Sequence, residues 1–155
     1  MAKKVRAIGE VRYADLSPEF RWDFATGVTE ALSRKYGKLI PRDNAFGTGR
    51  VLNALLSDNP VVEIVAVDPR RLKACQRMSG AVHTAMTERY RKAYLRGDEF
   101  PPIVVNSNLK DMLVEGLHRA CAADRADVVE ISALDVASVD LEALLRHGDK
   151  LLFPR

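Results

Sequence analysis

The sequence predicts an α+β fold, because short strand-like runs alternate with stretches that carry helical periodicity. The run 61–67 is apolar and rich in β-branched residues, which is typical of a buried strand. Apolar side chains recur at four-residue spacing from Phe20 to Leu32, which places them on one face of a helix. A chain of 155 residues, 47% of them hydrophobic, is long enough to bury one ordinary core.

The first sixty residues are expected to form a mainly helical N-terminal extension, residues 1–60. A helix should begin after Ser17, because serine is a favoured N-cap and Pro18 suits the first helical turn. Gly37 is expected to end it. A loop over 40–49 and a short helix over 50–56 follow. The polar run 57–60 contains Asn59-Pro60 and marks the boundary of the extension.

Residues 61–136 are expected to be the main core of the fold, since strand and helix patterns alternate there. The predicted strands cover 61–67, 103–105, 112–114 and 128–134. A helical stretch should end near Arg96, and a short helix should run from Leu117 to about Asp124. The C-terminal segment 137–155 is expected to contain a helix over 139–146, capped by Ser138, and an apolar tail.

The composition argues against membrane insertion and secretion. No apolar run approaches the roughly 20 residues that cross a bilayer, and the basic start Met1–Lys4 is not followed by an apolar signal region. The two cysteines, Cys75 and Cys121, form neither a metal-binding nor a disulfide framework. We therefore expect a cytoplasmic protein without a membrane partner and without a metal site built from its own side chains.

Positive charge is concentrated in the first hundred residues, which hold 18 basic against 12 acidic residues. The remainder holds 6 basic against 9 acidic residues. Basic side chains cluster most densely in 70–77 and 89–96. This pattern favours contact with nucleic acid or a free nucleotide. The alternative is that these are ordinary solvated helix faces.

Gly116 is predicted to stand where a strand ends and a helix begins. Glycine lets the backbone approach a ligand closely, and the new helix offers unpaired N–H groups at its positive end. Arg119 adds a planar guanidinium fork that suits phosphate oxygens. The corner therefore predicts a site for a phosphorylated ligand, most directly a nucleotide. Arg119 could instead pair with a surface carboxylate such as Asp124.

Two short segments carry a family resemblance. They are Phe100-Pro101-Pro102-Ile103-Val104-Val105 and Glu115-Gly116-Leu117-His118-Arg119-Ala120. In this order, and with their flanking strands, they resemble the ParB/sulfiredoxin superfamily over about half of the chain, residues 61–136. The resemblance implies a small mixed sheet flanked by helices, in which the proline-rich strand and the helix start bind a nucleotide together.

The resemblance also implies a set of nucleotide-binding residues in three groups. Gly116, Leu117, His118 and Arg119 would hold the phosphates; Pro101 and Pro102 would shape the neighbouring strand; Arg70, Arg71 and Lys73 would form a second cationic group. The position directly after the motif glycine, where sulfiredoxins carry their catalytic cysteine, is Leu117. Sulfinic-acid reduction is therefore not expected. The usual DNA-clamp form of ParB is not expected either, because no helix-turn-helix domain follows.

The leading functional hypothesis is phosphoryl transfer or phosphoester hydrolysis, of the ATPase, kinase or nuclease type. The cofactor would be a nucleoside triphosphate or diphosphate with Mg²⁺. Glu115 and His118 are the candidate catalytic residues, since a carboxylate or an imidazole can move a proton near neutral pH. Glu115 could equally be a solvent-facing strand residue, and His118 an ordinary partly buried histidine.

Two other interpretations stay open from the sequence. One is a non-enzymatic DNA-associated or regulatory adaptor with a degenerate nucleotide site, which the basic first hundred residues favour. The other is a homodimer that forms through the N-terminal helices or through the apolar tail 151–155.

Overall fold

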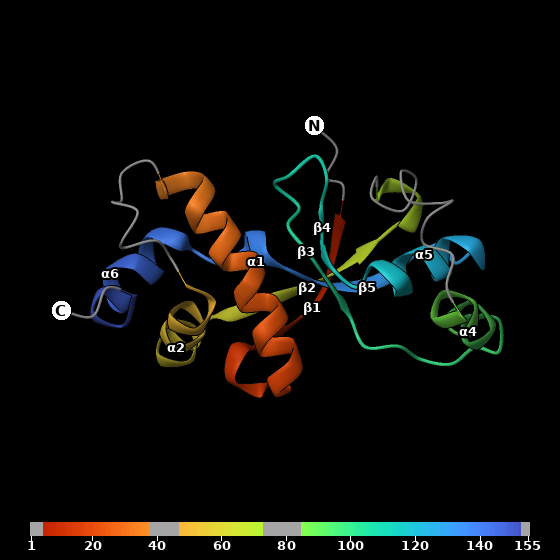
Figure 1. Cartoon of the computed structure of the whole chain (residues 1–155), viewed down its shortest axis with the longest axis horizontal. Coiled ribbons are helices and arrows are strands. Elements are labelled where there is room, and N and C mark those ends of the chain that lie inside the picture. The colour runs from red at the N-terminus through yellow and green to blue at the C-terminus, as the bar shows by residue number, and fades with distance from the viewer. Residues whose placement is uncertain (1–4, 38–46, 73–84, 153–155) are drawn as a thin grey trace. The chain divides into compact units, whose positions relative to one another are not determined.

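The computed structural model describes residues 5–37, 47–72 and 85–152 and has the expected α+β composition (Figure 1). The chain divides into two compact units. The first consists of Met1–Gly9 and Ile64–Asp135, and the second of Glu10–Glu63 and Val136–Arg155. The units interleave along the chain, whereas the sequence patterns divide it into three consecutive segments.

The strands form one five-stranded mixed sheet in the order β1-β2-β5-β3-β4. The strands are β1 (Val5–Arg12), β2 (Val61–Val67), β3 (Ile103–Val105), β4 (Leu113–Glu115) and β5 (Ile131–Asp135). The short strand β3 pairs antiparallel with β4 and parallel with β5. Its three residues are all buried, as expected for a strand with neighbours on both sides.

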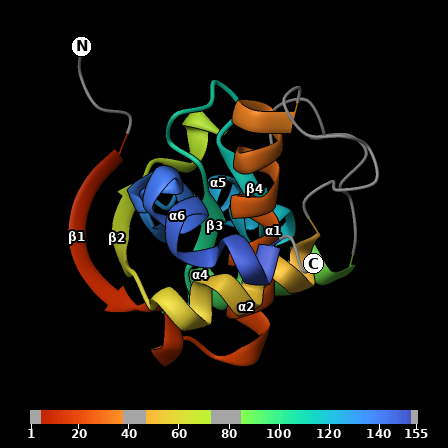
Figure 2. The ribbon, with the colours of Figure 1, turned by 90° about the vertical axis from the view of Figure 1, so that its left-hand side faces the viewer.

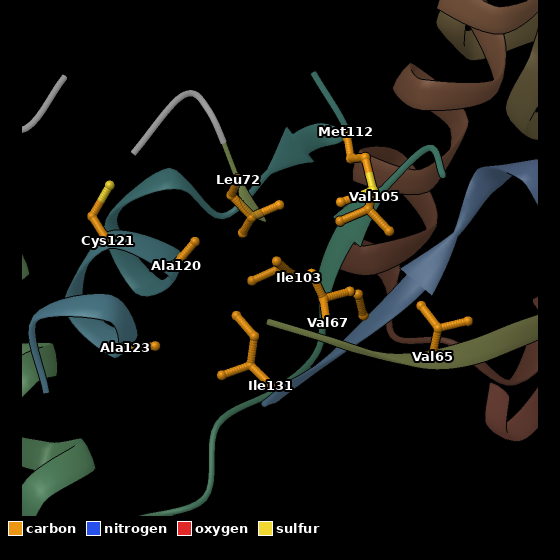
Figure 3. Close-up of a cluster of buried hydrophobic side chains, with 11 residues drawn as sticks. Val65, Val67, Leu72, Ile103, Val105, Met112, Ala120, Cys121, Ala123 and Ile131 are labelled. Atoms are coloured by element: carbon orange, nitrogen blue, oxygen red, sulfur yellow. The ribbon is translucent and has the colours of Figure 1, made fainter. Parts of the chain in front are cut away.

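In the first unit, α4 (Ala85–Leu95) packs against α5 (Leu117–Arg125), and the short 3₁₀ helix η4 (Pro69–Arg71) also contacts α5. Figure 3 shows that Ala120 and Ala123 of α5 belong to the same cluster of buried hydrophobic side chains as Ile103 and Ile131 of the sheet. Small side chains let the helix approach the strands closely. Cys121 is 3% exposed and belongs to this cluster, so its thiol lies in the core.

The second unit contains the end of β1, the start of β2 and several helices. Its described helices are α1 (Pro18–Tyr36), α2 (Thr48–Asp58), α6 (Leu141–Leu152) and the 3₁₀ turns η1 (Tyr13–Asp15) and η5 (Val136–Ser138). The Ser17 hydroxyl accepts a hydrogen bond from the Phe20 amide, which confirms the predicted start of α1. Helix α2 packs against both α1 and α6. A Cβ on Gly148 of α6 would lie 2.9 Å from the Ala54 Cβ of α2, so glycine permits this close approach.

The structure differs from the predicted local structure at two places. Residues 5–12 form a strand that the sequence patterns did not predict, within a segment whose described part is otherwise mainly helical, as expected. The last helix starts at Leu141, because the Asp140 carboxylate accepts a hydrogen bond from the Ala143 amide and caps it. The Ser138 hydroxyl accepts from the Glu63 amide instead, at 3.0 Å. Within the three described ranges, no helix is both long enough and apolar enough to span a membrane.

Tyr13 gives the second unit a predicted sensitivity to alkaline pH. Its side chain is fully buried and its hydroxyl donates to the Arg21 carbonyl oxygen. Burial raises the pKa of Tyr13 well above the ordinary value, and the Arg21 charge opposes this only in part. The unfolded chain therefore loses this proton first, so the free energy of unfolding should fall as the pH rises above about 10.

Urea denaturation across the range from about pH 8 to about pH 11 checks this expectation. Tyr13→Phe should cost about 1 kcal/mol at neutral pH, through the lost hydrogen bond, and should show a shallower loss of stability at high pH. Tyr94, whose pKa is also raised by burial, accounts for part of the pH dependence of stability that remains in the Tyr13→Phe variant. Parallel curves for the two proteins would contradict the assignment to Tyr13.

Candidate functional site

The corner between β4 and α5 has the geometry that only glycine readily adopts. Gly116 is the N-cap residue of α5 and has a φ of 102°, in the left-handed region. A Cβ at this position would lie 2.6 Å from the Cγ2 atom of Ile103 and 2.9 Å from its Cβ. The corner is therefore pressed against β3, and the glycine predicted from the sequence is required both by its backbone angle and by this contact.

Arg119 joins the two segments that the sequence singled out. Its Nη1 atom donates to the Pro101 carbonyl oxygen at 2.9 Å and to the Pro102 carbonyl oxygen at 3.2 Å. The guanidinium thus holds the chain that enters β3 against the start of α5. Among the described residues, no acceptor contacts its Nη2 or Nε atoms, so the group keeps donors for a ligand.

His118 is held by a helix that lies elsewhere in the sequence. Its Nδ1 atom is 3.1 Å from the hydroxyl of Thr87, a fully buried residue of α4. This contact fixes the plane of the imidazole. It uses Nδ1, so Nε2 is the ring nitrogen that a ligand could contact. When the Thr87 hydroxyl donates to Nδ1, Nε2 carries the proton. The ring is half-buried, so it can meet a ligand at the corner.

The first turn of α5 completes the corner. No side chain of the described residues caps it, and its first backbone bond runs from the Ala120 amide to the Gly116 carbonyl oxygen at 2.9 Å. The amides of Leu117, His118 and Arg119 precede this bond, and so they lie at the positive end of the helix dipole. Backbone N–H groups at such an end suit an anion.

The remaining candidates from the sequence lie in other surroundings. Glu115 is exposed at the end of β4. Arg70 and Arg71 are exposed on η4, and Arg70 makes a 2.7 Å ion pair with Asp68. The hydrogen bond from Arg70 lowers the pKa of the Asp68 carboxyl. Lys73 lies outside the described residues.

Arg70 also feels the charges at the far end of α5, the helix that η4 contacts. After Asp68, the charges that raise the pKa of its guanidinium belong to Asp124 and Asp127, at and just beyond the last turn of that helix. A nine-residue helix is roughly 13 Å long. The structure therefore brings 116–119 together with Pro101 and Pro102, and it places Arg70 among carboxylates at the other end of α5.

A pocket of about 440 Å³ lies beside the corner. Of the residues that the sequence analysis predicted to bind a nucleotide, only Pro101 lines it. Its wall includes the rings of Tyr94 and Phe100, whose centroids are 4.2 Å apart. Ile103, which contacts Gly116, also lines it. Burial raises the pKa of Tyr94 and the charge of Arg119 opposes that shift, so Arg119 lies near this wall.

The charged side chains of the pocket are all acidic. They are Asp98, Glu99 and Glu130. Asp98 pairs with Arg96 at 2.9 Å, and Glu130 accepts two hydrogen bonds from Arg6, at 2.9 Å and 3.1 Å. Such a wall repels phosphate and favours a neutral ring that carries amino groups. Positive groups are gathered at the neighbouring corner instead.

No set of three or more His, Cys, Asp or Glu side chains within the described ranges is arranged to hold a metal ion. Comparison with known proteins adds no assignment: no family model matches the chain, and no curated protein or solved structure is significantly similar to it.

Proposed function

We propose that this protein binds a nucleoside diphosphate or triphosphate, with Mg²⁺ on the phosphates, and that it is a ParB/sulfiredoxin-like protein. The observation that supports this most directly is the hydrogen bonding of Arg119 to the Pro101 and Pro102 carbonyl oxygens. It joins the glycine corner and the proline-rich strand into one site, which is the pairing that the sequence resemblance implies.

The corner would hold the phosphates. The amides of Leu117, His118 and Arg119 supply N–H donors at the positive end of α5. Charge-assisted hydrogen bonds from the remaining guanidinium nitrogens of Arg119 would add to them. The second ring nitrogen of His118, whose ring Thr87 holds in place, is a further donor when it carries the proton.

The neighbouring pocket would hold the nucleoside. A volume of about 440 Å³ is within the range of small-molecule sites, and aromatic rings provide a surface for a planar base. Glu99 makes no hydrogen bond or ion pair with another described residue, so its carboxylate can accept from an exocyclic amino group. Cytosine carries such a group where uracil has a carbonyl oxygen, and adenine also carries one, so bases with amino groups should be preferred.

Phosphoryl transfer or phosphoester hydrolysis is the chemistry that this arrangement serves best. Bound Mg²⁺ would neutralise charge on the phosphates. The corner would orient the reacting phosphoryl group, and Nε2 of His118 or the Glu115 carboxylate would take or deliver a proton. Binding without turnover would identify the site as regulatory rather than catalytic.

Titration calorimetry of the full chain with ATP, ADP, CTP and UTP in the presence of Mg²⁺ tests the proposal. We expect ATP and CTP to bind more tightly than UTP. Arg119→Gln should weaken binding by about tenfold or more, which corresponds to about 1.4 kcal/mol.

The matched control is Arg50→Gln, which removes the same charge from an exposed position on α2 and should leave the affinity unchanged. Because Arg119 also holds the Pro101–Pro102 backbone, circular dichroism of each variant should accompany the titrations. Absence of binding by every nucleotide, or equal affinity in the folded Arg119→Gln variant, would refute the proposal.

A further inference from the structure

The first strand of the sheet has an open edge. In the order β1-β2-β5-β3-β4, β1 is a terminal strand that is paired only with β2 within the described part of the chain. Figure 2 shows it as the outermost strand beside β2. None of its eight residues is buried, six are exposed, and the large apolar side chain of Ile8 is 49% exposed.

An exposed edge of this length presents unpaired backbone N–H and C=O groups to another strand. Proteins commonly protect such edges with charges of one sign, which repel a second copy. The inner charged residues of β1 have opposite signs: Arg6 and Glu10 lie two positions before and two positions after Ile8. This arrangement attracts a second copy instead of repelling it.

We propose that β1 pairs with β1 of a second copy of this chain, antiparallel and about a two-fold axis at Ile8. In this register Arg6 of each copy lies opposite Glu10 of the other, and Val5 lies opposite Val11. Oppositely charged and β-branched pairs at directly facing positions stabilise antiparallel strands. The two sheets then continue through the interface as one sheet.

The charges select this register against its neighbours. An axis at Gly9 places Arg6 opposite Arg12, and an axis at Ala7 places Arg6 opposite Ile8. Only the axis at Ile8 gives both Arg6 and Glu10 an opposite charge among residues 5–11. Like charges at facing positions destabilise a strand pair, which disfavours the axis at Gly9. The axis at Ala7 leaves Arg6 without an opposite charge.

The side chain of Arg6 is held in place by Glu130. Its Nη2 atom donates to both carboxylate oxygens of Glu130, at 2.9 Å and 3.1 Å. Among the described residues, its Nη1 and Nε atoms contact no acceptor, so the guanidinium can meet Glu10 of the second copy and keep Glu130. The Arg6 and Glu130 side chains are 66% and 44% exposed, so their own pair contributes little to folding.

A charge-exchange experiment on the full chain tests this interface, with molar mass measured by light scattering over a range of concentrations. The unaltered protein should be dimeric at the higher concentrations. Arg6→Glu gives like charges at both facing pairs and should be monomeric, and Glu10→Arg should be monomeric for the same reason. An equimolar mixture of the two variants restores opposite charges at both pairs and should form a dimer.

Arg50→Glu, a charge reversal at an exposed position on α2, is the control and should leave the dimer intact. The register is tested separately by oxidation. Ile8→Cys should cross-link to itself, whereas Glu10→Cys, which faces Arg6, should not cross-link above the level of the unaltered protein. A monomeric unaltered protein, or a mixture no more dimeric than its two components, would overturn the proposal. Retained dimers in both charge variants would overturn it as well.

Discussion

Replacing Gly116 with alanine should lower the free energy of unfolding by about 3 kcal/mol. Two separate costs contribute. The φ of 102° is a conformation that residues with a side chain rarely adopt, at a cost of about 1–2 kcal/mol. The new methyl group would also lie 2.6 Å from the Ile103 Cγ2 atom, so β3 and the start of α5 would have to separate.

Gly97→Ala separates these two costs. Gly97 also has a positive φ, 83°, but apart from its two chain neighbours no described residue has an atom within 4 Å of the Cβ position. This variant should therefore show the backbone cost alone, about 1–2 kcal/mol. Urea unfolding of both variants, monitored by circular dichroism, gives the comparison. Equal losses at the two positions would mean that the contact with Ile103 relaxes without cost.

Replacing Asp135 with alanine should cost about 3 kcal/mol through lost charge-assisted hydrogen bonds. Asp135 is 3% exposed and stands opposite Val105 in the parallel pairing of β5 with β3. Its carboxylate accepts from the Ser107 amide at 3.0 Å and from the Ser107 hydroxyl at 2.6 Å. It thereby fixes the turn that leads from β3 toward β4 and the Gly116 corner.

A double-mutant cycle with Ser107→Ala checks the origin of this effect. Ser107→Ala alone loses only the hydroxyl bond and should cost about 1 kcal/mol. In the Asp135→Ala background the same change should cost nothing further, because the acceptor is already absent. Additive losses would show that the two residues stabilise the fold independently.

Local sequence signals were sufficient where an element is determined by its own residues. Ser17 and Pro18 predicted the start of α1, and the β-branched run predicted β2. They failed for β1, because Val5–Arg12 mixes charges, alanine and glycine without a clear period. This strand forms through pairing with β2, which is distant in sequence and contributes nothing to a local pattern.

The candidate site was likewise predictable where it depends on neighbouring residues and unpredictable where it depends on distant ones. Gly116 was predicted from its place before His118 and Arg119, and the structure gives it the positive φ that makes glycine necessary. The acceptors of Arg119 could not be derived from its own neighbourhood, because they lie 17 and 18 residues away at the entry to β3. The pocket depends likewise on which loops the strand order brings together.

The interleaving of the two units determines when each can finish folding during synthesis. Helix α2 leaves the ribosome early, with Val51, Ala54 and Leu55 destined for burial, but α6, against which it packs, is made only after β5. Strands β2 to β5, which end at Asp135, emerge in between. Because domains fold as units once their residues are available, the nascent helical unit exposes apolar surface throughout that interval. Chaperone binding during translation should therefore concentrate on α2.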